Sequence, residues 1–441
     1  MGTTVESAHV ITTPGEQADP GVRIMRTLLR DYPGSAAFRV GDSLEHRVGD
    51  GAPVFTLVVR EPSVLRRLVL TRDPLILADA YIDDDIDFEG DFYAALGLKQ
   101  HFKGRAAPNL RDRWGLLLDA LRLPARPTAQ GSANATRGGR FRHEHSRQSD
   151  RAAIAYHYDV SNDFYRLWLD EQMVYSCAVF ESASDTLEQA QRNKLDLICR
   201  KLRLQGGERF LDIGCGWGAL VCWAARRYGV RAHGITLSEQ QLAVARERIA
   251  REGLHDRVTV ELRDYRDLPG VSAYDKIASV GMFEHVGLSR LAAYHATIHR
   301  LLRPGGLLLN HGITRDEEGW KKSPETEFIN RHVFPDAEID FVSNVTRSME
   351  QAGFEIHDVE GLRPHYARTL RHWVARLEAA HGEAVQRVGE ARYRIWRLYM
   401  AACALQFESG ALGIHQILAS RRGAGPYPVP LTRRDLYAPE R

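Results

Sequence analysis

A glycine-rich turn is the part of this sequence best suited to hold a ligand. Residues 210–213 read Phe-Leu-Asp-Ile, and residues 214–218 read Gly-Cys-Gly-Trp-Gly. The first segment is typical of a buried strand, and the apolar residues 219–225 that follow are typical of a buried helix. Glycines between a strand and a helix let a ligand approach the backbone closely. The turn therefore predicts a cofactor site, although a glycine turn alone does not identify the cofactor.

The strand predicted next narrows the choice of cofactor. Residues 230–238 have the composition of a second strand with a polar exit, which contains Thr236 and Ser238. A nicotinamide dinucleotide site would place an acidic residue at the end of this strand and would use the wider G-x-G-x-x-G spacing in the turn. Neither feature is present, so the pattern does not fit that class of cofactor.

Three further strands are predicted downstream. Residues 258–262 and 274–280 have strand composition, and residues 307–311 form a strand after the turn at 303–306. Helical segments separate the strands, and this alternation predicts βαβ units. We therefore expect an α/β domain.

The residues of these segments and the order of the segments resemble those of the cyclopropane-fatty-acyl-phospholipid synthase family of S-adenosylmethionine-dependent methyltransferases. The resemblance covers residues 151 to about 422 and rests on several segments in register, namely 157–165, 175–177, 214–218, 236–241, 281–287, 334–335, 366–370 and 393–399. It implies an α/β fold with a Rossmann-like class I methyltransferase sheet and helices on both faces. It also implies an activity, which is the transfer of a methylene unit to the cis double bond of an unsaturated phospholipid acyl chain to form a cyclopropane ring.

The same resemblance implies which residues bind S-adenosylmethionine. Residues 210–218 would cradle the methionine part and the ribose, and residues 236–241 would face the ribose and the adenine. The residues assigned to donor binding are Tyr175, Ser176, Asp212, Gly214, Gly216, Gly218, Thr236, Ser238, Gln241, Tyr265 and Arg266.

Methylation of a double bond produces a carbocation, which must be stabilised and must then lose a proton for the ring to close. Such a site needs electron-rich faces, the exclusion of water and a base. We expect Phe180, Trp320 and Tyr366 to supply aromatic faces. The resemblance implies that the base is a bound bicarbonate ion, held by groups that match Cys177, Glu284, His311, Ile313 and Tyr366.

Each of these residues also has a simpler interpretation. Cys177 could be a nucleophile, but the sequence shows no activating partner, and a buried inert thiol is more common. Glu284 and His285 resemble a fragment of a zinc motif, yet His-Glu-x-x-His is absent, so no metal site is predicted. His311 alone would be read as a core histidine, and Tyr366 alone as a packing residue.

Two segments depart from the pattern of the family. Residues 336–340 read Asp-Ala-Glu-Ile-Asp where members commonly have small residues or glycine and then proline, and Gly312 follows His311 where threonine is usual. We expect both segments to lie near the acceptor. The chain length, double-bond position and headgroup of the acceptor therefore stay open.

Composition places limits on the cellular setting. The 59 basic and 57 acidic side chains give a net charge of +2, so no global charge drives the protein onto nucleic acid. The five cysteines have neither metal-ligand nor disulfide spacing, which fits a reducing cytoplasm. No export signal and no long apolar span are apparent. We expect a cytoplasmic protein that is peripheral on the inner face of the membrane.

A chain of 441 residues is expected to form more than one domain. We predict a mobile tail at 1–20, a small α/β domain at 21–121, a basic flexible linker at 122–150 and the methyltransferase domain at 151–441. The resemblance assigns lipid handling to the small domain. The arginines of the linker would either attract anionic lipid or simply keep a solvated segment extended.

Several local predictions accompany these domains. Residues 52–59 have strand composition, 41–51 suit a strand and turn, and Ser63 is expected to cap a helix at 64–70. Near the C-terminus, residues 393–407 and 413–420 are strongly apolar and are predicted to be helices that could roof an acyl pocket.

Three alternatives to this activity stay open. The same attack could end in a methylene- or methyl-branched chain, the acceptor could be a soluble small molecule, or the chain could be a non-catalytic lipid-binding protein. The expected partner is an unsaturated phospholipid at the membrane surface, and the resemblance suggests a homodimer.

Overall fold

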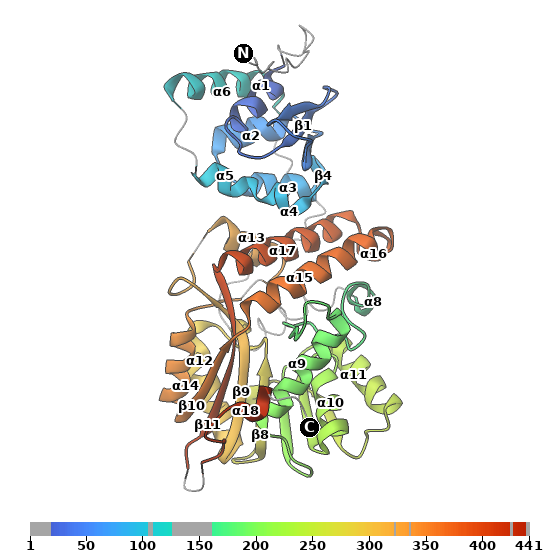
Figure 1. Ribbon diagram of the computed structural model, residues 1–441, viewed down its shortest axis with the longest axis vertical. Helices are drawn as coiled ribbons and strands as arrows, with labels where there is room; N and C mark the ends of the chain where they lie inside the picture. Colours follow the sequence, from blue (N-terminus) through green and yellow to red (C-terminus); the bar gives the residue numbers. More distant parts are fainter. Residues whose placement is uncertain are drawn as a thin grey trace, which may run out of the picture. The chain divides into compact units, whose positions relative to one another are not determined.

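The computed structural model describes residues 19–104, 109–125, 161–321, 323–334, 337–423 and 427–437 (Figure 1). The chain divides into two compact units, Met1–Arg137 and Gly138–Arg441, and this division falls within the predicted linker. Nearly all of the predicted tail and linker lie outside the described residues, as do residues 157–160 of the upstream motif. None of the described helices is long and apolar enough to cross a membrane.

The N-terminal unit contains a four-stranded sheet in the order β2-β1-β3-β4. Strand β1 runs parallel to β3, whereas the β1–β2 and β3–β4 pairs are antiparallel. The strands are β1 (Ala36–Val40), β2 (His46–Val48), β3 (Phe55–Val59) and β4 (Ile86–Gly90). The helices are α1 (Pro20–Leu28), α2 (Ser63–Thr71), α3 (Leu75–Ile82), α4 (Phe92–Leu96), α5 (Leu98–Gly104) and α6 (Leu110–Arg122). The small α/β arrangement expected from the sequence is therefore present.

The predicted cap at Ser63 is wrong. Helix α2 begins at Ser63 itself, and its N-cap is Pro62, which makes no side-chain capping bond. The Ser63 hydroxyl is buried and has no hydrogen-bond partner among the described residues. Proline at this position sets the backbone for the first turn, so the helix starts one residue earlier than a serine cap would allow.

The C-terminal unit is built on a seven-stranded sheet in the order β10-β11-β9-β8-β5-β6-β7. Five neighbouring strands, from β9 to β7, are parallel, and β11 lies antiparallel between β9 and β10. The strands are β5 (Arg209–Ile213), β6 (Arg231–Thr236), β7 (Val258–Leu262), β8 (Tyr274–Val280), β9 (Leu302–Arg315), β10 (Phe354–Gly361) and β11 (Leu412–Arg421). This mixed sheet with helices confirms the predicted fold class.

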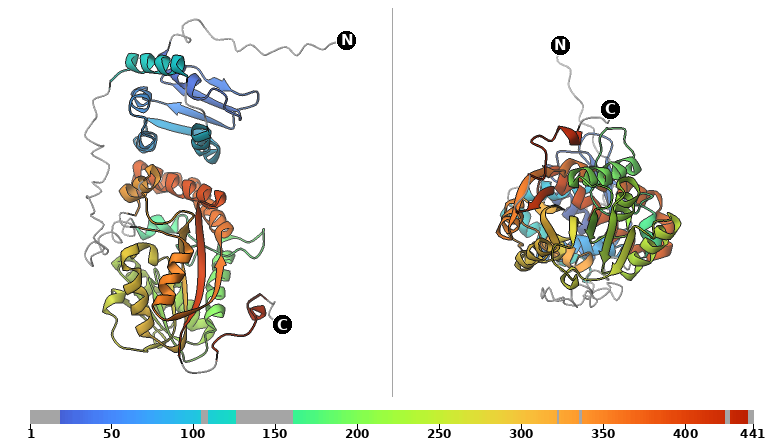
Figure 2. Two further views of the ribbon diagram at one scale, coloured as in Figure 1. Left: turned by 90° about the vertical axis from the view of Figure 1, so that its left-hand side faces the viewer. Right: turned by 90° about the horizontal axis from the view of Figure 1, so that it is seen from below.

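Helices cover both faces of this sheet, as the views at right angles show (Figure 2). Alternate strand residues point to opposite faces. Phe210 and Leu309 pack on the side of α9 (Leu187–Leu202), α10 (Ala219–Tyr228) and α11 (Glu239–Arg251). Leu211 and Leu308 pack on the side of α12 (Leu291–Leu301) and α14 (Val342–Gln351).

The remaining helical elements connect or flank the sheet. They are α8 (Asn162–Arg166), η2 (Tyr265–Asp267), η3 (Phe283–His285), η4 (Leu288–Arg290), α13 (Pro324–His332), α15 (Arg363–Ala379), α16 (His381–Val388), α17 (Glu390–Ser409) and α18 (Arg434–Tyr437).

One of the two C-terminal predictions is wrong. Residues 393–407 lie in helix α17, as predicted, but residues 413–420 lie in strand β11. This strand is paired on both sides and is buried along most of its length, so its sequence is apolar without the alternation of a half-exposed strand. A short apolar run of this kind cannot be distinguished from a buried helix by periodicity.

Candidate active site

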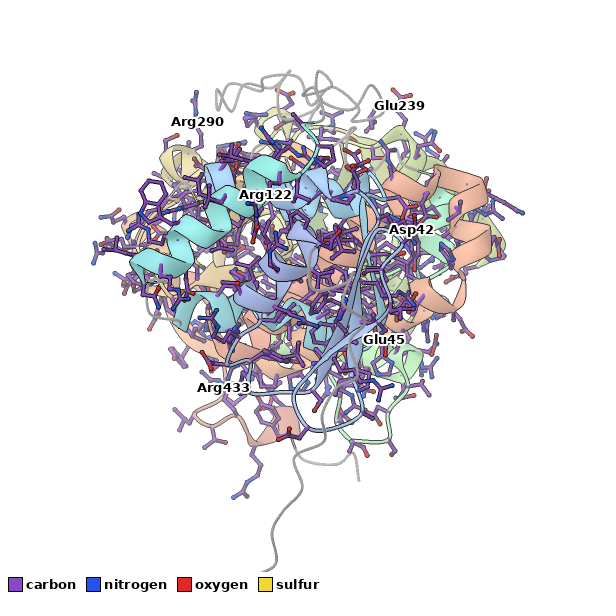
Figure 3. All side chains as sticks on the ribbon, turned by 90° about the horizontal axis from the view of Figure 1, so that it is seen from above. Asp42, Glu45, Arg122, Glu239, Arg290 and Arg433 are labelled. Atoms are coloured by element: carbon purple, nitrogen blue, oxygen red, sulfur yellow. The ribbon has the colours of Figure 1, made fainter. Side chains whose placement is uncertain are left out.

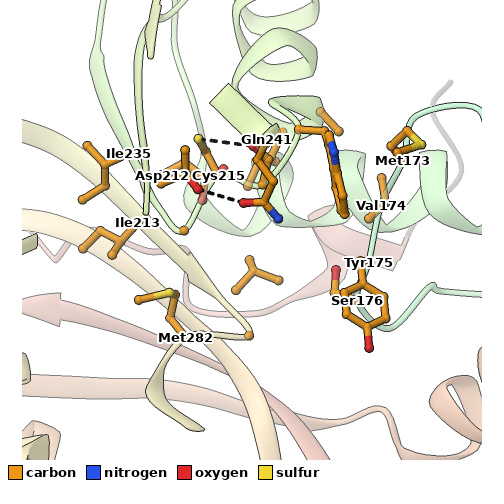
Figure 4. Close-up of a pocket in the computed structure, with 18 of the residues that line it drawn as sticks. Met173, Val174, Tyr175, Ser176, Asp212, Ile213, Cys215, Ile235, Gln241 and Met282 are labelled. Atoms are coloured by element: carbon orange, nitrogen blue, oxygen red, sulfur yellow. Dashed lines mark hydrogen bonds between the residues drawn. The ribbon is translucent and has the colours of Figure 1, made fainter. Parts of the chain in front are cut away.

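A pocket lies at the carboxyl ends of β5, β6 and β8, where the strand order of the sheet reverses. Strand β5 has β6 on one side and β8 on the other, and such a switch point is where open α/β sheets bind ligands. Eight of the eleven residues predicted to bind the donor line this pocket, namely Tyr175, Ser176, Asp212, Gly214, Gly216, Thr236, Gln241 and Tyr265. Tyr175 and Ser176 lie on the opposite side of the pocket from Ile213, Ile235 and Met282 (Figure 4).

The glycine turn has a conformation that other residues rarely adopt. Gly214 has a φ of +84°, and a Cβ there would lie 2.5 Å from Met282 Cγ. Gly216 has a φ of +53°, and a Cβ there would meet no atom within 4 Å. Gly214 is therefore required by both conformation and packing, whereas Gly216 is required by conformation and leaves space beside the backbone.

Three predicted donor-binding residues are not among those that line the pocket. Gly218 is the N-cap of α10, and Ser238 is the N-cap of α11, where its hydroxyl accepts a bond from Gln241 N at 3.2 Å. Arg266 pairs with Asp264 at 2.6 Å, and its guanidinium lies over the Tyr265 ring. These contacts are therefore with neighbouring backbone and side chains of the same segments.

The segment before β5 closes one side of the pocket through aromatic contacts. The indole N–H of Trp217, in the glycine turn, donates to Asn162 Oδ1 at 2.7 Å. Tyr165 packs against Trp217 and Tyr175, with ring centroids 5.1 and 5.7 Å apart respectively. The described part of the upstream motif therefore positions both the glycine turn and Tyr175.

Lys194 is a pocket residue that sequence reasoning missed. It is buried on α9, and its Nζ donates to Ser176 Oγ at 3.0 Å. Burial lowers the pKa of Lys194 to about 8, although the nearby carboxyls of Asp170 and Asp212 oppose this shift. Burial also raises the pKa of Asp212 to about 7, and its Oδ1 has no hydrogen-bond partner among the described residues. A buried cation and a buried carboxyl therefore face the same pocket.

The sequence did contain a signal for Lys194. Buried positions of α9 recur at helical spacing, and Lys194 and Lys201 interrupt this otherwise mostly apolar face. A lysine at a buried helix position is rarely without a partner. Other lining residues that were not predicted include Met173, Arg263, Met282 and His285.

A buried polar cluster adjoins the pocket at η3. Glu284 lies between the lining residues Met282 and His285, and its Oε1 accepts a hydrogen bond from Ile313 N at 2.7 Å. Its second oxygen, Oε2, is buried and has no partner within the described part of the chain. Burial raises the pKa of Glu284 to about 7. The Ile313 amide is thus already engaged by Glu284.

His311 lies two residues before Ile313 on β9, so both side chains face the same side of the sheet. His311 is fully buried, and neither ring nitrogen has a hydrogen-bond partner among the described residues. Burial lowers its pKa well below the ordinary value, so the imidazole is neutral. Gln416, its register partner on β11, is also fully buried, and its amide group makes no hydrogen bond to a described residue.

Gly312 lets η3 pack directly against β9. A Cβ at this position would lie 2.3 Å from Phe283 Cε1 and 2.9 Å from Glu284 Oε2. The second unusual segment also reaches η3, because Glu338 N donates to the Glu284 carbonyl at 2.9 Å. Both departures from the family pattern therefore adjoin Glu284, although residue 336 lies outside the described chain.

Cys177 and Tyr366 meet at Leu362. The Leu362 carbonyl accepts from Tyr366 N at 3.2 Å and lies 3.8 Å from the Cys177 thiol, while Leu362 N donates to Ile414 O at 2.8 Å. Ile414 is the register partner of Ile313. Burial raises the pKa of the Cys177 thiol, which leaves the sulfur a poor nucleophile. Backbone bonds thus join the elements that carry Tyr366, Ile313 and His311, and the Cys177 thiol contacts the same network.

Aromatic rings connect the pocket to Tyr366. The Tyr175 ring lies 5.3 Å from Trp373, which lies 6.0 Å from Tyr366, which in turn lies 4.7 Å from Phe407. The other two predicted aromatic residues, Phe180 and Trp320, each contact an arginine. Arg368 covers the Phe180 ring at 4.2 Å, and Arg315 lies over Trp320 at 5.7 Å, so a positive charge already occupies one face of each ring.

Comparison with known proteins gives consistent matches. The family model described as mycolic acid cyclopropane synthetase matches residues 145–417. A probable fatty acid methyltransferase of Pseudomonas putida is 42% identical over 88% of this chain and 92% of its own length. The cyclopropane-fatty-acyl-phospholipid synthase of Escherichia coli K12 is 34% identical over 87% of this chain and 93% of its own length.

A solved structure also matches this chain. It is that of mycolic acid cyclopropane synthase CmaA1 complexed with SAH and CTAB, with 34% identity and a TM-score of 0.58. The match covers 61% of this chain and 98% of that chain.

Proposed function

This chain belongs to the mycolic acid cyclopropane synthetase family and is a methyltransferase of the cyclopropane synthase type, and from this premise we propose its reaction. It transfers a methylene unit from S-adenosylmethionine to the cis double bond of an unsaturated phospholipid acyl chain. The acceptor follows the name of the Escherichia coli relative, and the donor follows the SAH complex of CmaA1. The reaction takes place at the membrane surface, where such acyl chains are found.

The residues of the pocket fit the proposed donor. S-adenosylmethionine carries a carboxylate and an ammonium group in its methionine part, and Lys194 and Asp212 offer the complementary charges. The buried Asp212 Oδ1 has no partner among the described residues, as expected for an atom that binds a ligand group. The open backbone at Gly216 lets the ligand approach closely.

The observation that carries the proposal is the pair of buried polar groups beside this pocket. Glu284 Oε2 and the His311 imidazole have no hydrogen-bond partners among the described residues, and a buried polar group without a partner is costly. A bicarbonate ion fits here, because its hydroxyl can donate to Glu284 and its oxygens can accept from the neutral imidazole. Bicarbonate would supply the base that takes the proton lost on ring closure.

The aromatic rings supply the other requirement of the reaction. Tyr175, Trp373 and Tyr366 form a row of contacting aromatic rings that leads from the pocket to α15. Their electron-rich faces stabilise positive charge on the acceptor, and their packing keeps water out. An arginine already occupies one face of Phe180 and of Trp320, so we assign the stabilisation of the cation to the other three rings.

Mass spectrometry of fatty acids tests the proposal. Purified protein is incubated with S-adenosylmethionine and unsaturated phospholipid vesicles, in bicarbonate-depleted and bicarbonate-supplemented buffer. We expect a gain of one CH₂ that survives mild hydrogenation unchanged and depends on bicarbonate. No lipid product, with S-adenosylmethionine still bound, would contradict it.

A second candidate product is a methyl- or methylene-branched chain. The name of the Pseudomonas putida relative, probable fatty acid methyltransferase, favours this alternative. Both products begin with the same methylation, which leaves the cation on the carbon next to the methylated one. A methylene branch forms when a 1,2-hydride shift moves the cation to the methylated carbon before the methyl group loses a proton, whereas a saturated methyl branch needs a hydride donor in addition. A product that takes up hydrogen in the same experiment would identify the methylene-branched chain.

A further inference from the structure

Helix α6 of the N-terminal unit exposes an apolar stripe to solvent. Four large apolar side chains lie on it, and their exposed fractions are 72% for Leu110, 63% for Trp114, 52% for Leu118 and 52% for Leu121. At 3.6 residues per turn these positions fall within about 80° of the helix circumference. The four side chains therefore form one continuous stripe along the helix, which we call the α6 stripe.

The opposite side of α6 carries acidic residues that face inward. The Asp119 carboxylate accepts hydrogen bonds from Nε and Nη2 of Arg23 in α1, the Nε bond to Oδ2 at 3.0 Å, and Asp112 pairs with Arg30 at 2.6 Å. Arg66 donates to the carbonyls of Leu121 and Leu123 at 3.0 and 2.8 Å, which caps the C-terminal end of the helix. The helix is thus held to the unit by charged contacts while its apolar side faces outward, the reverse of an ordinary surface helix.

Arginines border the α6 stripe on both sides. Arg111 and Arg122 follow Leu118 around the helix, and Arg113 lies beyond Leu110 on the other side. All three are exposed, and Arg122 lies at the end of α6, on the outside of its unit (Figure 3). Arg111 and Arg113 form no ion pair with any described residue, whereas Arg122 reaches Asp119 at 3.3 Å. The outer face of α6 is therefore apolar and cationic.

We propose that α6 is a membrane-docking helix that inserts its stripe into an anionic phospholipid surface. A leucine-rich apolar face with a tryptophan and flanking arginines has the chemistry of a helix that lies in the membrane interface. The apolar side chains enter the boundary of the acyl chains, and the arginines bind the phosphate groups. A second copy of the chain fits less well, because pairing two α6 faces would bring like charges together.

Vesicle co-sedimentation of the full-length protein tests this assignment. We expect stronger binding to vesicles of phosphatidylcholine with phosphatidylglycerol than to phosphatidylcholine alone, and weaker binding at high salt. Leu118→Ser/Leu121→Ser should lower the partition coefficient about tenfold or more, because two inserted leucines are lost. The matched control is Leu44→Ser/Val54→Ser, whose leucine and valine are 65% and 51% exposed elsewhere in the same unit and should not matter.

The charge of the stripe border is tested separately. Arg111→Gln/Arg113→Gln should weaken binding to the anionic vesicles about fivefold for each arginine and leave binding to neutral vesicles unchanged. Arg47→Gln/Arg72→Gln removes the same charge outside α6 and should have little effect. Equal loss in both pairs would mean that general charge, not α6, governs binding and would overturn the proposal.

A labelled variant tests the proposal without removing the stripe. All five native cysteines are buried, so an exposed Leu118→Cys can be labelled selectively with an environment-sensitive fluorophore. We expect a blue shift on anionic vesicles, and none for Leu44→Cys. A label at position 118 that stays in water, or wild-type binding by Leu118→Ser/Leu121→Ser, would overturn the proposal. A change of that variant from dimer to monomer with unchanged vesicle binding would instead identify the stripe as a protein interface and would also overturn it.

The test of membrane docking by α6 and the test of the proposed reaction can fail independently. The stripe variant should keep wild-type S-adenosylmethionine affinity and wild-type activity on lipid dispersed in detergent, and lose activity on vesicles. Vesicle binding without any lipid product would contradict the reaction alone.

Discussion

Glu284 combines one engaged carboxyl oxygen with one that has no hydrogen-bond partner in the described structure. Glutamine has nearly the same shape and can still accept from Ile313 N, but it cannot ionise. If Glu284 holds the base, Glu284→Gln should slow turnover about 100-fold or more while S-adenosylmethionine affinity changes little. Isothermal calorimetry and product formation measure the two effects. Equal losses of affinity and rate would exclude the role given to Glu284.

Glu284 also makes stability depend on pH. In the unfolded chain the carboxyl ionises near its ordinary pKa of 4.5, whereas burial raises the folded pKa to about 7. Between these values the unfolded state has released a proton that the folded state retains, so the free energy of unfolding falls as pH rises. The full difference corresponds to about 3 kcal/mol.

Glu284→Gln should therefore remove part of this decline. Urea unfolding of both proteins at about pH 5 and about pH 8 measures it, and the variant should lose less stability between the two values. Asp212 has a similarly raised pKa and is unchanged in both proteins, so the informative quantity is the difference between them. Parallel pH curves would show that Glu284 is already ionised in the folded protein.

Lys194 and Lys201 form a natural pair for testing the donor pocket. Both are buried on α9, but Lys194 contacts Ser176 in the pocket, whereas Lys201 pairs with Glu360 of β10. Lys194→Met should weaken S-adenosylmethionine binding about tenfold, or about 1.4 kcal/mol, because the donor carboxylate loses its cation. Binding of 5′-methylthioadenosine, which lacks the amino acid part, should not change.

Lys201→Met serves as the control for Lys194. It leaves Glu360 without its partner and should reduce stability without altering donor affinity. Equal weakening of both nucleosides by Lys194→Met would show that the pocket as a whole had been disturbed.

At the scale of elements, the contact between η3 and β9 depends on Gly312. Gly312→Ala would place a methyl group 2.3 Å from Phe283 Cε1 and 2.9 Å from Glu284 Oε2. Both distances are too short for a contact, so η3 would have to move away from β9. We expect a loss of about 1–3 kcal/mol in the free energy of unfolding together with a large loss of turnover. Chemical denaturation and activity assays measure these effects.

Gly382→Ala, in helix α16, provides a matched substitution. A Cβ at Gly382 meets no atom within 4 Å, so alanine should be neutral or slightly stabilising there. If Gly312→Ala were equally harmless, η3 would have to be free to move away from β9, and the close packing would not control the position of Glu284.

At the scale of the whole molecule, the two proposed tasks lie on different units. All residues that line the donor pocket belong to Gly138–Arg441, and α6 belongs to Met1–Arg137. The solved CmaA1 chain is matched over 98% of its length by 61% of this one, which indicates that the catalytic fold can stand alone. The isolated unit 138–441 should therefore bind S-adenosylmethionine as tightly as the full chain, yet lose binding to anionic vesicles.

Calorimetry and vesicle co-sedimentation of the isolated unit measure the two properties. Weakened donor binding would show that the N-terminal unit supports the pocket. Retained vesicle binding would place the membrane contact on the catalytic unit instead.

The sequence by itself determined the fold class and the family, and eight of the eleven residues that it predicted to bind the donor line one pocket. Glycine turns, strand compositions and the segments around them are local signals, because a residue such as Gly214 is required by its own backbone conformation. Such signals can be read along the chain without knowledge of distant contacts. The prediction for residues 413–420 was wrong because a short apolar run does not reveal whether it forms a helix or a strand.

Only the tertiary structure decided which side chains meet. Packing between separate elements produced four features of the site. They are the Glu284 oxygen without a hydrogen-bond partner in the described structure, the arginines over Phe180 and Trp320, the close approach at Gly312 and the lysine in the pocket. The outward direction of the α6 stripe also depends on the ion pairs of Asp119 with Arg23 of α1 and of Asp112 with Arg30. Burial, and with it pKa and exposure, is a property of the packed chain, so no pattern within one segment could have determined it.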